Sequence, residues 1–327
     1  MNLQYREAAP VATLIPALLA CCIDIASAQT YPRQSIRMVV PFPAGGGIDT
    51  VARIFSPKLS ENLGQPIVID NRSGAGGTVG TEMVAKAAPD GHTLLATFAS
   101  HSVNALLYSH LNYDTVKDFA PITLLATVPN ILIVNPSLPV KNVKDLIALA
   151  KKQPGKILYA SVGNGTPAHL SAELFNMMAG TTMTHVAYKG AAPSIVALIS
   201  GETQLTFTTV LIALPHVKSG KLRAIGVASL KRARVMPDVP TIDESGLPTY
   251  ESNAWYGLLA PAKTPPPVID LLHRETVKVL QLPAVRDNFL NQGAEPVGNM
   301  PGEFAAIITA EIEKWRKVVQ ATGAKAD

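Results

Sequence analysis

The sequence predicts an α/β fold with two lobes, each containing a sheet rich in parallel strands. Short apolar strands alternate with helical patterns along most of the chain, which is typical of parallel sheets covered by helices. The chain has 327 residues, enough for two domains. The order strand, glycine loop and helix occurs at residues 38–50 and again at residues 157–170. We therefore expect two comparable units far apart in the sequence.

Composition indicates a globular protein with ample core material. Hydrophobic residues make up 47% of the chain and charged residues 16%, and the formal net charge is +4. The basic residues are scattered. The densest run, residues 231–234, is too short and too poor in aromatic residues for nucleic-acid binding.

The N-terminus predicts an export signal over residues 1–28. Arg6 precedes a largely apolar stretch at residues 11–25, and Ala26-Ser27-Ala28 is an A-x-A cleavage site. Leu18-Leu19-Ala20-Cys21 also resembles a lipoprotein cleavage box, so lipidation at Cys21 is the alternative to soluble export. Either route predicts a periplasmic protein. The mature part then contains no cysteine, because Cys21 and Cys22 are the only two.

The first loop, residues 41–49, follows an expected strand at residues 35–40 and precedes an expected helix at residues 50–63. Gly45, Gly46 and Gly47 leave backbone N–H groups accessible, and the positive N-terminal end of the helix lies beside them. This arrangement suits an anion, although a turn without a ligand is the alternative. The loop has neither the Lys-Ser/Thr pair of a P-loop nor dinucleotide spacing. We expect Asp49 to cap the helix and brace the loop more readily than to contact a ligand.

The second loop, residues 163–166, repeats this arrangement after an expected strand at residues 157–161. Thr166 is a suitable N-cap, with Pro167 at the first helical position. We expect a polar loop at residues 98–104. The remaining expected strands are residues 67–69, 93–97, 131–134, 186–188, 205–208, 223–228 and 255–260. The remaining expected helices are residues 78–88, 143–152, 195–199, 214–218, 268–280, 285–291 and 303–319.

Motifs for catalysis are absent from the sequence. There is no G-x-S-x-G, and the seven histidines do not pair at metal-ligand spacing, so we expect them at the surface or as capping residues. We predict no enzyme activity, no cofactor and no metal. Export, two anion-suited helix starts and the lack of catalytic groups together indicate a two-lobed extracytoplasmic binding protein, with its ligand between the lobes.

Motifs along the whole mature chain match one family. They are residues 31–32, 36–47, 71–77, 88–91, 113–114, 117–121, 163–166, 188–190, 213–216, 238–241 and 293–298. Through them the chain resembles the Bug (TctC-like) solute-binding proteins of tripartite tricarboxylate transporters. The resemblance implies a periplasmic-binding-protein fold of the Venus-flytrap, type II-like kind. It implies binding of organic acids, amino acids or aromatic carboxylates, whose carboxylate the two loops hold through backbone N–H groups and ordered water.

The resemblance also implies domain limits and partners. One lobe would comprise residues 30–127 and 253–327, the other residues 128–252, with a hinge motion on closure. We expect a monomer that binds a small carboxylate and meets membrane transporter subunits, without nucleic acid. The alternative is a periplasmic sensor that passes its bound state to a membrane receptor such as a sensor kinase. Turnover of a bound carboxylate would instead indicate an enzyme.

The candidate ligand-binding residues follow from the two loops. They are Phe42, Ala44, Gly45, Gly46, Gly47, Ile48 and Asp49 in the first lobe, Asn164, Gly165, Thr166 and Thr208 in the second, and more weakly Phe98 and Ser100. The family usually has Thr where Ile48 stands and Phe-Asp where this chain has Phe207-Thr208. Since Thr208 cannot pair with an ammonium as an ion, we hypothesise a carboxylate without an amino group, with an apolar or aromatic body next to Ile48 and Phe42.

Overall fold

The computed structural model describes residues 1, 3, 31–323 and 325. By its contacts the chain divides into residues 1–31 and a compact unit that starts at Pro32 and contains every helix and strand described below. The predicted signal peptide, apart from Met1 and Leu3, lies outside the described residues, as do Cys21 and Cys22. In the part of the chain that the structure describes, no helix has the length and apolar character needed to span a membrane.

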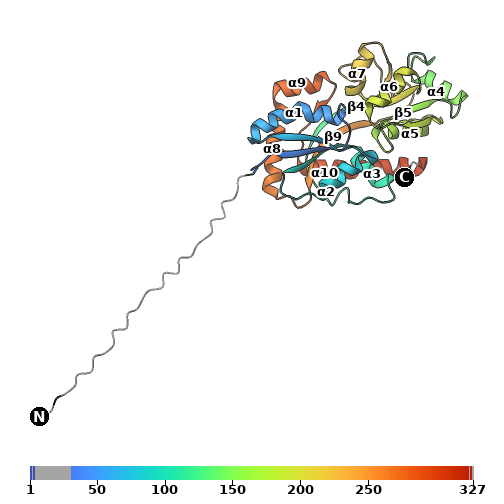
Figure 1. Ribbon diagram of the computed structural model, residues 1–327. Helices are drawn as coiled ribbons and strands as arrows, with labels where there is room; N and C mark the ends of the chain where they lie inside the picture. Colours follow the sequence, from blue (N-terminus) through green and yellow to red (C-terminus); the bar gives the residue numbers. More distant parts are fainter. Residues whose placement is uncertain (2, 4–30, 324, 326–327) are drawn as a thin grey trace. The chain divides into compact units, whose positions relative to one another are not determined.

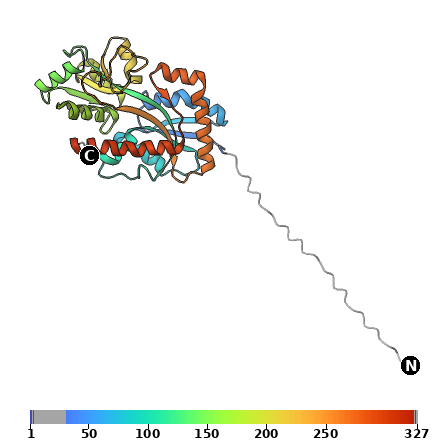
Figure 2. The same ribbon diagram turned by 180° about the vertical axis from the view of Figure 1, so that it is seen from behind.

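One half of the compact unit is a mixed sheet with helices on both faces. Strand β1 (Ile36–Val40) pairs in parallel with β2 (Ile67–Asn71) and β3 (Thr93–Phe98). Strand β9 (Asn253–Pro261) lies antiparallel to β3, and the short β10 (Glu295–Pro296) pairs with β4 (Phe119–Val134). Helices α1 (Gly47–Leu63), α8 (Pro266–Gln281) and α9 (Pro283–Asn291) contact one another on one side. On the other side lie α2 (Thr78–Ala85), α3 (Ser100–Leu107) and α10 (Pro301–Thr322) (Figure 1 and Figure 2).

The other half is a second mixed sheet, built around β7 (Leu205–Thr209). This strand is parallel to β5 (Leu158–Ser161), which pairs in parallel with β6 (Thr184–Ala187). Strand β8 (Arg223–Val227) pairs with β4. The helices of this half are α4 (Val143–Lys152), α5 (Pro167–Ala179), α6 (Ala191–Ser200) and α7 (Val210–Lys218), which lie together in Figure 1.

Strand β4 belongs to both sheets. From Phe119 to Pro129 it pairs antiparallel with β9, and from Asn130 to Val134 it pairs with β7 and β8. The strand is 16 residues long. It therefore carries the backbone hydrogen-bond network from one half of a two-lobed molecule to the other. The lobe limits near Thr127 and Asn253 stay a prediction.

Each half has its own buried aromatic residues. In the first, Trp255 on β9 meets Phe304 on α10 edge to face, with ring centroids 5.3 Å apart. Gly257 allows this contact, because a Cβ there would lie 2.1 Å from the Phe304 ring. In the second half, Phe175, Phe207 and Tyr250 form the centre of the core. The compact unit from Pro32 onward therefore has a separate hydrophobic core in each of its two lobes.

The structure corrects several expectations. The predicted polar loop at residues 98–104 is wrong, since α3 begins at Ser100. Its polar residues suggested a solvent-exposed loop, but α10 packs against α3 and these residues are buried. Strand β4 begins 12 residues before the predicted strand, because Pro121 and Pro129 obscured it. The sheets are rich in parallel strands as expected, and β4 and β9 are the long strands that run antiparallel to their neighbours.

Candidate functional site

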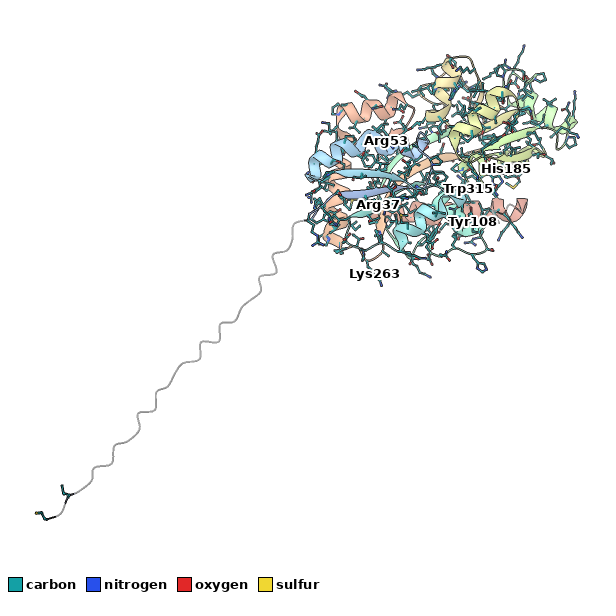
Figure 3. All side chains as sticks on the ribbon, viewed as in Figure 1. Arg37, Arg53, Tyr108, His185, Lys263 and Trp315 are labelled. Carbon is teal, nitrogen blue, oxygen red and sulfur yellow. The ribbon has the colours of Figure 1, made fainter. Side chains whose placement is uncertain are left out.

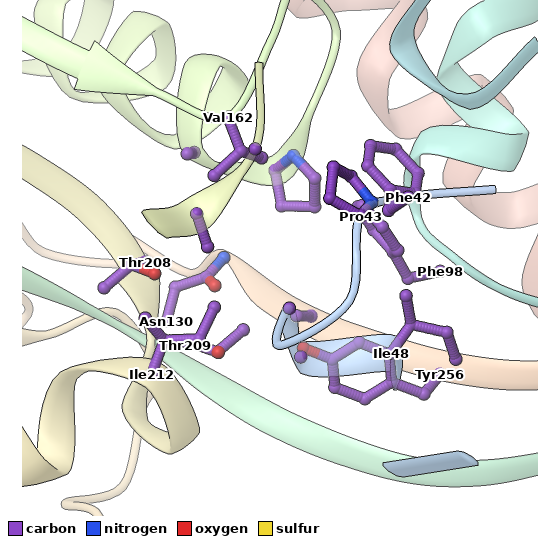
Figure 4. Close-up of a pocket in the computed structure, with 17 residues that line it drawn as sticks. Phe42, Pro43, Ile48, Phe98, Asn130, Val162, Thr208, Thr209, Ile212 and Tyr256 are labelled. Atoms are coloured by element: carbon purple, nitrogen blue, oxygen red, sulfur yellow. The ribbon is translucent and has the colours of Figure 1, made fainter. Parts of the chain in front are cut away.

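A small chamber lies between the first glycine loop and the residues that flank the second. Its volume is about 60 Å³, and residues from both halves of the molecule line it (Figure 4). The first half contributes Phe42, Pro43, Gly46, Gly47, Ile48, Phe98, Ala254 and Tyr256. The second half contributes Val162, Pro167, Ala168, Gly190, Ala191, Thr208, Thr209 and Ile212, and Asn130 comes from β4. Most of this wall is apolar.

The polar groups of the chamber are neutral. They are the amide of Asn130 and the hydroxyls of Thr208, Thr209 and Tyr256, which lie around the chamber in Figure 4. Burial raises the pKa of Tyr256 to about 12, so this phenol keeps its proton at neutral pH. Among the described residues, none that lines the chamber is an Asp, Glu, Lys, Arg or His. A ligand there would meet hydrogen-bonding groups without a charged side chain.

Four helices begin at the chamber wall. Gly47 starts α1, Pro167 starts α5 and Ala191 starts α6, while Thr209 is the N-cap of α7. None of the four has a hydrogen bond from a capping side chain. Each helix N-terminus carries a partial positive charge and N–H groups without partners in the helix. The backbone therefore gives this apolar chamber a positive potential suited to an anion.

The first loop is held by Asp49. This carboxylate accepts hydrogen bonds from the Gly45 N–H and Arg53 Nε, both at 2.9 Å, and from Asn71 Nδ2 at 3.1 Å. Burial alone would raise the pKa of Asp49, but the hydrogen bonds from Arg53, Gly45 and Asn71 outweigh it and lower the pKa. Asp49 is 2% exposed and does not line the chamber. Its position fits the bracing role expected from the sequence.

Contact with Tyr256 explains why position 47, at the end of the first loop, requires glycine. A Cβ on Gly47 would lie 2.1 Å from the Tyr256 hydroxyl. Gly45 has a φ of +80°, a conformation that residues with a side chain rarely adopt. The two positions need glycine for different reasons, one for close approach and one for backbone conformation.

The second loop is held from behind by Ser161 and His169. The Gly165 N–H donates to His169 Nδ1 at 3.1 Å, and the Ser161 hydroxyl donates to the Gly163 carbonyl at 3.0 Å. Thr166 occupies the N-cap position as expected, but its hydroxyl bonds back to the Gly163 carbonyl. The expectation that His169 lies at the surface is wrong, because its exposure is 6%. His101 is likewise buried, in α3.

Six predicted site residues line the chamber: Phe42, Gly46, Gly47, Ile48, Phe98 and Thr208. Asn164 lines a larger cleft of about 620 Å³ that shares Phe42, Pro43, Val162 and Gly190 with the chamber. Gly45 lines a separate groove beside α6 and α7. Ala44, Asp49, Ser100, Gly165 and Thr166 line none of these three hollows. Their direct contact with a ligand stays a prediction.

Sequence reasoning missed Asn130, Thr209 and Tyr256. Asn130 is a polar residue inside an otherwise apolar strand, and Thr209 directly follows Thr208, so both left a weak signal. Tyr256 left none, because β9 reaches the chamber only through its pairing with β3 and β4.

The family of the chain follows from comparison with known proteins. Residues 51–324 match the family model described as "Tripartite tricarboxylate transporter family receptor", TctC. The chain belongs to this family. Among curated relatives, Protein BugT of Bordetella pertussis is 39% identical over 301 residues, covering 91% of this chain and 92% of BugT. A UPF0065 protein of Pseudomonas sp. strain P51 is 37% identical, covering 89% of this chain and 87% of the relative.

Solved structures of TctC and Bug proteins have the same two-lobed architecture. Periplasmic binding protein BugD matches with a TM-score of 0.85 and 35% identity, over 90% of this chain and 99% of BugD. R. palustris Rpa4515, solved with adipate, matches with a TM-score of 0.87 and 37% identity, over 90% of this chain and 99% of Rpa4515. MatC from Rhodopseudomonas palustris, solved with malate, matches with a TM-score of 0.84 and 34% identity, over 88% of this chain and 100% of MatC.

These matches confirm the resemblance, the fold class and the prediction of a protein that is not an enzyme. TctC and Bug proteins are periplasmic binding proteins.

Proposed function

We propose that this TctC-family protein works in the periplasm, captures a small carboxylate in the chamber and delivers it to a tripartite tricarboxylate-type membrane transporter. The observation that carries the proposal is the meeting of four helix N-termini at a chamber without a charged side chain. In such surroundings a carboxylate gains hydrogen bonds and a favourable potential, whereas a cation meets an unfavourable potential.

The walls of the chamber support a ligand with an apolar or aromatic body and no amino group. Phe42 and Phe98 lie against each other with ring centroids 4.5 Å apart, and Ile48 lines the same chamber. Thr208 offers a hydroxyl, and no carboxylate is present among the described lining residues to pair with an ammonium. Adipate and malate, the ligands in the structures of Rpa4515 and MatC, are carboxylates without amino groups.

Entry of such a ligand requires the lobes to move apart. The chamber of about 60 Å³ is much smaller than the hundreds of Å³ typical of small-molecule sites. We propose a hinge between lobe one, residues 30–127 with 253–327, and lobe two, residues 128–252. The paired strands β4 and β9 connect them.

Calorimetry with adipate, malate, benzoate, aspartate and glutamate at neutral pH tests the ligand class. We expect at least one of the first three to bind and the two amino acids to bind at least tenfold more weakly, about 1.4 kcal/mol. Gly46→Val should abolish binding while the protein remains folded, because the side chain would enter the chamber. Gly302→Val, at a site with nothing within 4 Å of the Cβ, is the matched control. Tight binding of aspartate or glutamate alone would refute the ligand class, and unchanged affinity of Gly46→Val would refute the site.

Export and delivery are tested in cells of the natural host. Deletion of the gene should abolish uptake of the labelled ligand identified by calorimetry, and the full-length gene should restore it. A mature protein that starts at Gln29 would indicate soluble export, whereas a lipid-bearing Cys21 would indicate anchoring. Unchanged uptake, with the bound protein recovered on a membrane receptor, would contradict delivery to a transporter and favour a sensor.

A further inference from the structure

Two histidine rings are stacked directly behind the second loop. His169, in the first turn of α5, and His185, on β6, have ring centroids 4.1 Å apart and planes 7° from parallel. Tyr159 on β5 stacks on His185 at 4.9 Å. We name these three residues the histidine stack. His185 lies among the strands and helices of the second half of the molecule, as Figure 3 shows.

Both imidazoles connect to the loop, but in chemically different ways. His169 Nδ1 accepts a hydrogen bond from the Gly165 N–H at 3.1 Å, which requires a lone pair on this nitrogen. His185 Nε2 lies 2.6 Å from the Ser161 hydroxyl oxygen, which also accepts from the Gly163 N–H. A proton added to His185 leaves an Nε2–H able to donate to Ser161. A proton added to His169 at Nδ1 eliminates the bond to Gly165.

The loop in turn sets the wall of the chamber. Val162 precedes it, and Pro167 and Ala168 follow it at the N-terminus of α5, and these three residues line the chamber. Gly165 has a φ of +71°, and a Cβ there would lie 2.2 Å from Leu107. The loop is thus held between α3 in front and His169 behind, and loss of either support would let the α5 terminus shift.

The carboxylate at the stack contacts Tyr159 and neither of the two imidazoles. The Tyr159 hydroxyl donates to Glu173 Oε1 at 2.5 Å, so this carboxylate is bound to the phenol at the far end of the stack. The elements packed against α5 turn uncharged side chains toward it, namely Leu107 from α3, Phe207 from β7 and Trp315 from α10. Among the described residues, neither ring forms an ion pair with a carboxylate.

Burial accordingly keeps both rings neutral at physiological pH. It lowers the pKa of His169 to about 3, with a further contribution from His185, and it lowers the pKa of His185 to about 4. The Nδ1 lone pair of His169 is therefore available to Gly165 over the whole neutral range. In acid, protons on the stack would break this bond and place two like charges 4.1 Å apart.

We propose that His169 is a positioning residue of the ligand site: its neutral ring holds the second loop so that the N-terminus of α5 faces the chamber, and its protonation releases the loop and the ligand. This inference rests on the proposed binding of a carboxylate. It adds a role for a buried residue that does not line the chamber, and it makes ligand release responsive to acid.

Two substitutions separate the effect of the hydrogen-bond acceptor at residue 169 from the effect of its protonation. His169→Asn places an amide oxygen near the former Nδ1, so it can accept from Gly165 but cannot be protonated. His169→Ala removes the acceptor. His110→Asn, at an exposed histidine, is the control for loss of an imidazole. Each variant is compared with the full wild-type chain, and far-UV circular dichroism at every pH reports whether it is folded.

Adipate is the probe, with its dissociation constant measured from pH 7.5 to pH 3. The ratio of variant to wild type at each pH removes the titration of adipate itself. At pH 7.5 we expect wild-type affinity for His169→Asn and about tenfold weaker binding for His169→Ala, the scale of one lost hydrogen bond. Between pH 4.5 and pH 3, where the His169 ring takes up its proton, the wild type should lose affinity relative to His169→Asn. Wild-type affinity of His169→Ala at every pH, or equal pH profiles for wild type and His169→Asn, would overturn the proposal.

A readout without ligand distinguishes this inference from the proposed function. In nuclear magnetic resonance spectra, the Gly165 amide signal of the wild type should titrate together with the His169 ring. In His169→Asn, which has no ring at this position, the Gly165 signal should lack this titration. An uncoupled Gly165 signal overturns the positioning role, whether or not adipate binds. A coupled signal in a protein that binds no member of the carboxylate panel refutes the proposed function and leaves the positioning of the loop standing.

Discussion

At the residue scale, the shape of the first loop depends on a few atoms. The carboxylate of Asp49 accepts three hydrogen bonds. The Tyr256 hydroxyl occupies the space that a side chain on residue 47 would need. Removing a buried partner or adding one methyl group is costly at such sites, because the neighbours have no room to adjust.

We expect Gly47→Ala to disrupt ligand binding and to destabilise the fold by about 1–3 kcal/mol, because its Cβ would lie 2.1 Å from the Tyr256 hydroxyl. Urea unfolding and calorimetry with the best ligand measure the two effects. The double variant Gly47→Ala with Tyr256→Phe should recover part of the stability, since the hydroxyl is the closest atom. Gly45→Ala is the matched control, because nothing lies within 4 Å of its Cβ and only its φ of +80° opposes the change. Normal binding by Gly47→Ala would show that the loop can move away.

The sequence sufficed for residues whose role is local. The three glycines, the bracing carboxylate of Asp49 and the N-cap position of Thr166 follow from their immediate neighbours along the chain. Asn130, Thr209 and Tyr256 reach the chamber through pairing between distant strands, which no local pattern reports. His169 was misjudged because a histidine in a first helical turn is usually exposed, whereas here β5 and β6 cover it.

At the element scale, alternation of strands and helices predicted most elements but not the directions of all strands. Strands β1, β2 and β3, and likewise β5, β6 and β7, are parallel as expected. The two strands that join the halves, β4 and β9, are antiparallel to them, and prolines inside β4 concealed it. The polar face of α3 was likewise hidden, because burial of Ser100, His101 and Asn104 depends on packing against other elements.

At the scale of the whole molecule, three histidines, the buried His101 and His169 and the half-buried His185, couple folding to pH. Burial lowers the pKa of His101 to about 4, and those of His169 and His185 to about 3 and 4, against 6.5 in the unfolded chain. Between pH 4 and pH 6.5 the unfolded state therefore binds more protons at these rings than the folded state does. Stability from this source is complete above pH 6.5 and is lost as the pH falls from there toward 4.

We therefore expect the midpoint of urea unfolding to fall as the pH is lowered from 7 to 4.5, with an uptake of up to about three protons on unfolding and a slope of up to about 4 kcal/mol per pH unit. His169→Asn should reduce this uptake by about one proton. A midpoint that is constant between pH 7 and pH 5 would show that the three rings are not kept neutral by the fold.

The positive potential of the chamber belongs to the main chain of α1, α5, α6 and α7 and not to any side chain. A replacement in the chamber wall that introduces no charge leaves this potential in place. Ile48, Phe98 and Thr208 can therefore exchange for other uncharged residues during evolution while attraction for anions persists. Preference among ligands can diverge on this fold by changes in the wall alone.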